Sequence, residues 1–402
     1  PSPRDFGTER STGPRPRRMR RAPSPPPRLS RFADRRAFLI NGRRMSLRIH
    51  ARNFRAVRTL DWTIPDGVSV LTGANGSGKT TCLFVLRLLQ LAVERGWPSA
   101  VDLLGGGNSL RTHGAPRGEA IELGIDVDDL SWRLHLMPHG TSVTVREELL
   151  QSGVSQPIYV ADGNEEKFQV QALHRDDPDD RNVGKIFHAL SKISVFYDAD
   201  LSGLREGGSR IAGVRTVHSQ GKNVLAVLRS WRDRKAMKGR FDFVMEGMKA
   251  AFPELFESMD FEVAGQTVSA SIYRPGAEES TLLNFEANGI LSLLITLTEV
   301  ASAEPGSLVA IDEPEVGLHP FAIRQMLESL HHRAQSIGCR IVVTSRSPVL
   351  LNAFQAMPER ILVLDPKEGA FAKPLTEIRT PSWLVSFALG ALYADGEFAA
   401  NG

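Results

Sequence analysis

Cysteine is scarce in this chain of 402 residues, and long apolar runs are missing from it. The two cysteines, Cys82 and Cys339, fall inside a predicted helix and beside a predicted strand, so the sequence indicates neither a disulfide framework nor a zinc site. A helix that crosses a bilayer needs about 20 apolar residues in succession, and no run approaches that length. We therefore expect a cytoplasmic protein without a membrane partner, and its apolar fraction of 42% is ample for a folded core.

The basic charge of the chain is concentrated in residues 1–44. This segment holds thirteen arginines and three acidic residues, so its net charge is +10. Because the whole chain has a net charge of +3, residues 45–402 carry a net charge of −7. It also holds eight prolines and few apolar residues, a composition that cannot bury a core, so we expect disorder. Three origins stay open: a non-native extension ahead of Met45, an arginine-rich arm that contacts nucleic acid, and a targeting peptide, which the prolines disfavour.

A glycine-rich loop is the most specific motif in the chain. The segment from Gly73 to Thr80 reads GANGSGKT and matches the pattern GxxxxGK[ST], for which a chance match in a chain this long is on the order of 1%. An apolar strand is expected over residues 68–72 and an apolar helix over residues 80–94. Glycines let backbone N–H groups surround a β-phosphate, and the helix N-terminus adds the positive end of its dipole. The alternative is a glycine-rich turn that caps an ordinary helix.

ATP with Mg²⁺ is the ligand that this loop predicts. Lys79 is expected to reach the β- and γ-phosphates, and the Thr80 hydroxyl to occupy one Mg²⁺ position. The residues of the loop predicted to bind the nucleotide are Gly73, Asn75, Gly76, Ser77, Gly78, Lys79, Thr80 and Thr81.

A second motif predicts the other half of the site. Residues 307–314 read SLVAIDEP, in which four apolar residues are followed by two carboxylates. Such a strand is buried on both faces of a parallel sheet and delivers side chains at its carboxyl end, where nucleotides bind. Asp312 is predicted to hold Mg²⁺, directly or through water, and Glu313 to polarise the attacking water. The two motifs strengthen each other, because each predicts the presence of the other.

The order of the predicted elements indicates an α/β fold of the P-loop NTPase class. We expect a mixed central sheet, an antiparallel β meander over residues 120–147 and an inserted, mainly helical lobe. Further strands are expected over residues 339–344 and 361–365, joined by right-handed crossovers. The predicted domains are residues 45–165 and 261–402, as two halves of the ATPase, and residues 166–260, as the inserted lobe.

Three motifs carry a resemblance to a known family. GANGSGKTT, IDEPEVGLHP and VVTSRSPVLLN are similar to segments of RecF/OLD-like, SMC-like ABC-type ATPases, often called AAA family ATPases. The resemblance runs from about Met45 to the C-terminus and is specific only in these motifs. It implies a head of the ABC-ATPase type, two copies of which sandwich two ATP molecules in a head-to-tail homodimer. Such proteins serve DNA repair, chromosome maintenance or anti-phage defence, frequently with a separate nuclease or other effector protein.

Two positions depart from the family pattern. The signature before a helix reads Ala287-Asn288-Gly289, so the family's serine is missing, and the resemblance carries over Asn288 and Gly289 as nucleotide contacts. The switch histidine is replaced by Arg346, and no clear glutamine occupies the switch loop after the first helix.

Arg346 is predicted to be catalytic. It follows a strand next to that of Asp312, so its side chain should emerge at the same edge of the sheet. Its planar fork of donors suits the charge that develops in phosphoryl transfer and would partly offset the serine missing at Ala287. The alternative is an ion pair with a surface carboxylate such as Glu315.

Three histidines are weighed as well. His319 matches the family and either lies at the dimer contact or caps the next helix. His331 and His332 are expected on an exposed helix face and not in a metal site.

Two functions of different classes are consistent with this sequence. The first is an active ATPase whose turnover gates a partner that acts on DNA; the second is an ATP-responsive scaffold that holds an effector with negligible turnover. The 239 residues between Gly73 and Asp312 are too few for a long coiled-coil arm, and the 58 residues after Thr344 are too few for an appended nuclease. Direct contact with DNA stays open.

Overall fold

The computed structural model describes residues 45–116, 118–163, 169–210, 216–365 and 371–398. The disordered extension expected over residues 1–44 lies outside these ranges. Within them, no helix combines the length and the apolar character needed to cross a membrane.

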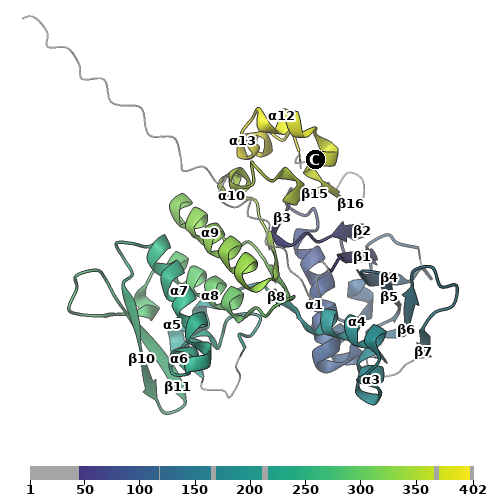
Figure 1. The fold of residues 1–402 in the computed structure, drawn as a ribbon, viewed down its shortest axis with the longest axis horizontal. Coiled ribbons are helices and arrows are strands. Elements are labelled where there is room, and N and C mark those ends of the chain that lie inside the picture. The colour runs from purple at the N-terminus through teal and green to yellow at the C-terminus, as the bar shows by residue number, and fades with distance from the viewer. Residues whose placement is uncertain (1–44, 117, 164–168, 211–215, 366–370, 399–402) are drawn as a thin grey trace, which may run out of the picture. The chain divides into compact units, whose positions relative to one another are not determined.

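A six-stranded sheet carries the predicted motifs (Figure 1). Its order is β16-β15-β3-β14-β13-β8; the strands from β15 to β8 are parallel, and β16 pairs antiparallel with β15. The four strands expected from apolar runs are all present in it. The strands of this sheet are β3 (Gly67–Gly73), β8 (Ile193–Phe196), β13 (Leu308–Ile311), β14 (Arg340–Thr344), β15 (Ile361–Asp365) and β16 (Phe371–Pro374).

Successive residues of these strands face two separate hydrophobic clusters. On β14, Ile341 and Val343 belong to one cluster, whereas Val342 belongs to the other. The first cluster contains the buried side chains of helices α8 and α9, and the second contains those of α1. Because helices cover both faces, every strand position can be apolar, and the strands read as continuous apolar runs.

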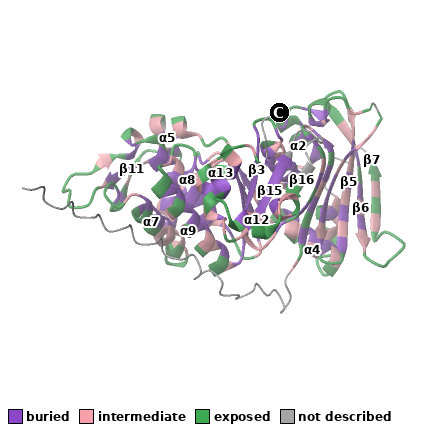
Figure 2. Ribbon diagram, turned by 90° about the horizontal axis from the view of Figure 1, so that it is seen from above, coloured by how far each residue is buried: buried purple, intermediate pink, exposed green. Residues whose placement is uncertain are grey.

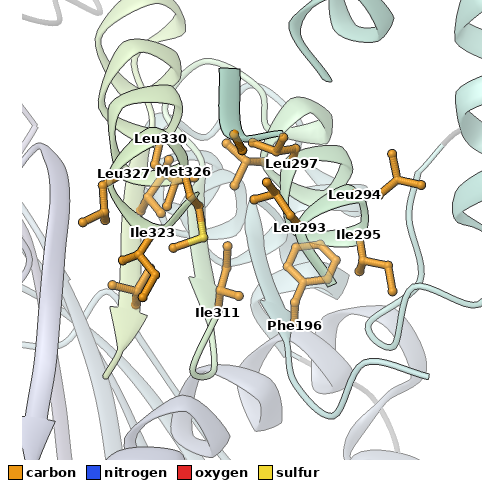
Figure 3. Packing of buried hydrophobic residues seen from close by; sticks show 14 of the residues in the cluster. Phe196, Leu293, Leu294, Ile295, Leu297, Ile311, Ile323, Met326, Leu327 and Leu330 are labelled. Carbon is orange, nitrogen blue, oxygen red and sulfur yellow. The ribbon is translucent and has the colours of Figure 1, made fainter. Parts of the chain in front are cut away.

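Figure 3 shows part of the first cluster, which fixes the end of β13. Leu293 of α8 and Met326 of α9 share this cluster with Ile311 of β13 and Phe196 of β8. A fully buried side chain of this size contributes roughly 1.5–3 kcal/mol relative to an exposed one. Packing from two helices therefore holds Ile311, the residue directly before Asp312, in a fixed position.

The predicted antiparallel meander is confirmed and forms a second six-stranded sheet, with the order β2-β1-β4-β5-β6-β7. Buried and exposed residues alternate along β1, so one face packs on the core that α1 shares and the other meets solvent. Its strands are β1 (Leu47–Phe54), β2 (Val57–Thr63), β4 (Ile121–Val127), β5 (Leu130–His139), β6 (Ser142–Gln151) and β7 (Tyr159–Gly163).

Residues 166–260 differ from the single helical lobe that the sequence predicts. β8 lies inside this range, yet it pairs in parallel with β13 as an edge strand of the central sheet. The buried side chains of α4, such as Ile186, belong to the cluster that contains α1. The physical reason is that β8 has only four residues, Ile-Ser-Val-Phe, too few to show a period, and only pairing with a distant strand identifies it.

The rest of this range, from β9 onward, packs with α8. β9 (Ser209–Arg210) and β10 (Ser258–Ala264) form a small antiparallel sheet with β11 (Thr267–Tyr273) and β12 (Thr281–Leu282), which follow this range. The buried residues concentrate in α8 and the central strands (Figure 2).

The helices are α1 (Lys79–Arg95), α2 (Trp97–Leu103), α3 (Gln169–Asp176), α4 (Arg181–Ser191), α5 (Leu201–Gly207), α6 (Val224–Arg232), α7 (Lys238–Ala251), α8 (Asn288–Ser302), α9 (Pro320–Ile337), α10 (Pro348–Ala353), α11 (Leu375–Ile378), α12 (Pro381–Val385) and α13 (Leu389–Ala394).

Candidate functional site

The glycine-rich loop joins the end of β3 to the start of α1. Gly76 and Gly78 have φ values of +76° and +99°, which residues with a side chain rarely adopt. At Gly73, a Cβ atom would lie 2.6 Å from the carbonyl oxygen of Leu364 on β15, so this position also requires glycine. No side chain caps the start of α1, which follows Gly78 directly. The loop thus presents the backbone N–H groups of a helix N-terminus, an arrangement that binds phosphate groups.

Lys79 and Tyr393 converge on one carbonyl of this loop. The Lys79 ammonium donates hydrogen bonds to the carbonyl oxygens of Gly73, at 2.8 Å, and Ala74, at 2.9 Å. The Tyr393 hydroxyl on α13 donates to the same Gly73 oxygen at 3.1 Å. Burial lowers the pKa of Lys79, and the neighbouring Glu313 carboxylate opposes that change. Because carbonyl oxygens of the loop itself hold the ammonium, Lys79 can transfer its donors to a phosphate bound in the loop.

Thr80 and Asp312 bring the two predicted motifs into contact. The Thr80 hydroxyl donates to Asp312 at 3.1 Å. Asp312 also accepts a hydrogen bond of 2.5 Å from the hydroxyl of Thr344, at the end of β14. Burial raises the pKa of Asp312, and the hydrogen bonds from Thr344 and Thr80 oppose that rise.

The Thr80 and Asp312 oxygens fit a magnesium ion. Mg²⁺ takes ligands at about 2.1 Å in an octahedron, so two adjacent ligands lie roughly 3 Å apart. The separation of 3.1 Å between the Thr80 hydroxyl and the Asp312 carboxylate matches that value. In the described residues no group of three or more His, Cys, Asp or Glu side chains could hold a metal ion. Phosphate and water would therefore supply the remaining ligands, as is usual for Mg²⁺.

Glu313, directly after Asp312, has a left-handed backbone. Its φ of +42° is uncommon for a residue other than glycine and costs roughly 1–2 kcal/mol. The Glu313 N–H donates to the hydroxyl of Thr344 at 2.9 Å, and the same hydroxyl donates to Asp312. Thr344 therefore fixes both acidic residues from the neighbouring strand.

Arg346 lies between Glu313 and the glycine-rich loop. Its guanidinium donates to Glu313 Oε2 at 2.5 Å and to Asn75 Oδ1 at 2.8 Å. The hydrogen bond and the charge of Glu313 raise the pKa of Arg346. Because β13 and β14 are adjacent and parallel, the two strand ends meet, as the sequence predicts.

Glu315, the partner weighed as an alternative for the Arg346 side chain, has a different role. This buried carboxylate accepts a hydrogen bond of 2.5 Å from the Ser345 hydroxyl and one of 3.3 Å from the Arg346 backbone N–H. Burial raises the pKa of Glu315, and the bond from Ser345 opposes the rise. Glu315 thus connects the loop after β13 to the loop after β14 and fixes the backbone at Arg346.

The predicted signature residues lie at the start of α8 and are held by other contacts. Arg205 donates to the Asn288 side chain at 2.7 Å. A Cβ atom on Gly289 would lie 2.5 Å from the carbonyl oxygen of Gly317, so glycine permits close approach to the loop after β13. Ala287 occupies the N-cap position, and no side chain caps this helix end.

Two of the three histidines have observed contacts. His319 caps α9, since its Nδ1 accepts from the N–H of Phe321 at 3.3 Å; a dimer contact stays a prediction. The exposed face expected for His331 is wrong, because its Nδ1 lies 2.8 Å from the Leu327 carbonyl oxygen and its ring packs on Phe354. Burial accordingly lowers the pKa of His331.

The sequence analysis missed Thr344 and Tyr393. Thr344 had one available signal, a hydroxyl at the carboxyl end of a buried strand that neighbours the acidic strand. Tyr393 had no such signal, because nothing in the sequence connects it to a carbonyl 320 residues away.

A comparison with protein-family models gives one match. Residues 218–352 match the family described as "AAA domain, putative AbiEii toxin, Type IV TA system". The matched range includes Asp312, Glu313 and Arg346, and it leaves out the glycine-rich loop. No curated protein matches the chain.

Solved structures with a similar fold are heads of SMC proteins. The SMC head bound to the C-winged helix domain of ScpA is 13% identical, with a TM-score of 0.51, over 83% of this chain and 99% of that chain. A head with an extended coiled coil, bound to the C-terminal domain of ScpA derived from Pyrococcus furiosus, is 10% identical, with a TM-score of 0.49, over 83% of this chain and 97% of that chain. The head from Thermotoga maritima is 13% identical, with a TM-score of 0.38, over 82% of this chain and 98% of that chain. The first likeness confirms the predicted P-loop NTPase fold of the ABC-ATPase-head type. With the family match, it confirms the resemblance to SMC-like ATPases.

Proposed function

We propose that this chain, which has the fold of an SMC-like ATPase head, binds MgATP and hydrolyses it slowly. The observation that carries the proposal is the hydrogen bond between Thr80 and Asp312. It joins the glycine-rich loop to the acidic strand end at the spacing that a Mg²⁺ ion requires of two adjacent ligands.

Each side chain of the site has one step in this proposal. Lys79 would exchange its two carbonyl acceptors for the β- and γ-phosphates, while Thr80 and Asp312 hold Mg²⁺, which neutralises the charge developing on the phosphates. Glu313 would orient and polarise the attacking water. The ion pair with Arg346 supports this role, because the same guanidinium also donates to Asn75 and so holds the Glu313 carboxylate beside the glycine-rich loop.

Arg346 would regulate Glu313 and stabilise the transition state. In the structure its guanidinium is shared by Glu313 and Asn75. A γ-phosphate next to the loop would compete for the same donors, and a guanidinium that moves to it would leave Glu313 free to polarise water.

The proposed assembly is a head-to-tail homodimer that forms on ATP and gates a partner protein. Exposed apolar side chains of Phe285 and Val316, 75% and 60% accessible, flank the start of α8 and support a contact at this face. An SMC head was solved with a domain of ScpA bound, which supports a separate protein partner here. We further propose that the partner is a nuclease or other effector in DNA repair or anti-phage defence. A cytoplasmic location and direct contact with DNA are also part of the proposal.

A scaffold with negligible turnover is the second candidate, and Ala287 favours it. A serine hydroxyl at that position could cap α8 and contact a γ-phosphate across the dimer, and alanine can do neither. Steady-state phosphate release with MgATP separates the two functions. Turnover that Glu313→Gln removes identifies the ATPase, whereas MgATP binding with no release above the buffer rate identifies the scaffold.

Replacing Arg346 tests its proposed share of catalysis. In Arg346→Ala we expect turnover to fall at least roughly tenfold, because the N–H donors of the guanidinium are lost. This fall corresponds to a loss of about 1.4 kcal/mol of transition-state stabilisation. Phosphate release at saturating MgATP measures this, with calorimetry for affinity. Arg324→Ala, which removes an exposed arginine of α9, is the matched control. Unchanged turnover and affinity in Arg346→Ala would reduce this arginine to a surface ion pair.

Replacing Tyr393 tests whether the C-terminal helix supports the loop. Once Lys79 contacts phosphate, the Gly73 carbonyl would lose the hydrogen bond from Lys79 and keep the one from Tyr393. Tyr393→Phe removes a bond worth about 1 kcal/mol, so we expect roughly fivefold weaker MgATP binding. Calorimetry measures the affinity, and Tyr273→Phe on β11 is the control. Equal affinities for Tyr393→Phe and the parent would show that the loop needs no such support.

A further inference from the structure

A cavity of about 330 Å³ lies between α8, the loop after β8 and the end of β13. At about 30 Å³ for each water of the liquid, it has room for roughly ten waters, more than structural hydration of a few polar groups requires. Its volume lies in the range of small-molecule sites, which begins at about 300 Å³.

A polar stripe of α8 faces this cavity. Asn288, Ser292, Thr296 and Glu299 all line it, and their spacing of four, four and three residues places them on one face of the helix. The other buried positions of α8 are mainly leucine, isoleucine and valine. Over eleven residues the stripe extends about 16 Å along the helix axis, so the cavity has one long polar wall.

Glu299 is the buried end of the stripe. Glu299 is only 3% exposed, and in the described part of the chain its side chain makes no hydrogen bond or ion pair. Burial raises its pKa well above the usual value. A buried carboxyl without a partner is unfavourable, and a helix that otherwise packs in an apolar cluster has no packing requirement for one.

The cavity is acidic from its mouth to its floor. Asp198 and Asn288 are exposed and mark the mouth, whereas Thr296 and Glu299 are buried and mark the floor. No lysine, arginine or histidine is among the lining residues. Apolar side chains, Leu201 and Ile295 among them, line the cavity as well. Such a site favours a cation with an aliphatic body.

We propose that this cavity binds a small organic cation, an alkyl chain that carries an ammonium group at each end. One ammonium pairs with Glu299 on the floor, and the hydroxyl of Thr296 accepts a second hydrogen bond from it. The alkyl chain lies along Leu201 and Ile295, and the other ammonium meets Asp198 at the mouth.

Glu299 is poised for such a ligand because a cation restores the charged carboxylate. A buried charge is stable when it is paired and hydrogen-bonded, which the ammonium provides with its three donors. The ligand would also lie against Asp312 and Glu313, which share the cavity wall. An effect on turnover rests on the proposed function, whereas binding to the cavity does not.

Calorimetric titration without nucleotide tests the site. The probe is 1,8-diaminooctane, and 1,8-octanediol is its uncharged match in length and body. We expect the diamine to bind and the diol not to bind. Glu299→Gln keeps the volume of the side chain and should weaken diamine binding at least tenfold, while Glu304→Gln, the same change at an exposed position, should leave it unchanged.

Asp198→Asn provides a second variant at the mouth. Asp198 has a φ of +51°, which asparagine tolerates, so folding should be unaffected and the diamine should bind more weakly. Equal affinity of diamine and diol, equal affinity of Glu299→Gln and the parent, or no binding of the diamine to the parent would each overturn the proposal.

The same ammonium chemistry could reach the site on a free polyamine or on a lysine side chain of another polypeptide. N-acetyl-lysine amide separates these sources, because it carries one ammonium and a neutral amide in place of the second. Tighter binding of the diamine identifies the free polyamine, whereas tighter binding of the lysine derivative would overturn the proposal of a ligand with an ammonium group at each end.

Discussion

In Glu313→Gln, the rate of phosphate release should fall by a factor of about 10² to 10⁴, the range typical for loss of a general base. Glutamine keeps the size and the hydrogen bonds of the side chain but cannot take a proton from water. ATP should therefore bind as well as in the parent and persist. The measurement is steady-state phosphate release together with calorimetric MgATP affinity. Glu328→Gln, at an exposed position on α9, should behave as the parent.

The same variant tests the proposed dimer. If ATP holds two heads together, Glu313→Gln should stay dimeric with ATP for longer than the parent, because hydrolysis no longer separates them. Light scattering that reports one mass with and without ATP would count against the sandwich. Full turnover in Glu313→Gln would assign the base to another residue.

Lys79→Ala should lose most of its affinity for MgATP. The ammonium would make hydrogen bonds of roughly 1.5–3 kcal/mol each to the β- and γ-phosphates. Loss of two such bonds predicts at least roughly hundredfold weaker binding, since each 1.4 kcal/mol is tenfold. Calorimetry with MgATP measures this.

The control for Lys79 is Lys249→Ala, which removes an exposed lysine of α7. Because Lys79 also bonds to Gly73 and Ala74, a melting curve should accompany the titration. A folded Lys79→Ala protein that binds MgATP as tightly as the parent would show that the nucleotide binds elsewhere.

The parts of the site that the sequence predicted are those set by local chemistry. Gly76 and Gly78 are required by positive φ values within the loop itself, and Lys79 and Thr80 follow in the first turn of the helix. Asp312 could be placed at the nucleotide site because it directly follows a buried apolar strand, and in a parallel sheet the carboxyl ends of the strands form the edge where nucleotides bind.

The pairing of Arg346 could not be chosen from the sequence. Glu313 and Glu315 are both in the loop after β13, and either could have met the guanidinium. In the structure Arg346 donates to the carboxylate of Glu313, while Glu315 is buried against Ser345. That choice depends on the hydrogen bond from the Glu313 N–H to Thr344, a tertiary contact without a sequence signature.

β8 and His331 show a second limit of prediction. The four residues of β8, three of them apolar, are too few to show a period, so their place at the sheet edge depends on β13. His331 lies on a helix beside a second histidine, and the side chain of Phe354, from another helix, covers it. In both cases the deciding partner is remote in the chain.

The position of β3 within the sheet has a consequence for synthesis of the protein. β3 is flanked on one side by β14 and on the other by β15, and the contact of Thr72 with Ser345 joins residues 273 apart. At about 5–20 residues per second, the ribosome needs tens of seconds to supply these neighbours. During that time an apolar strand has both edges unpaired, a state prone to aggregation. Pairing of β3 therefore waits for the last third of the chain, and so does the contact of Thr80 with Asp312 that joins the two halves of the site.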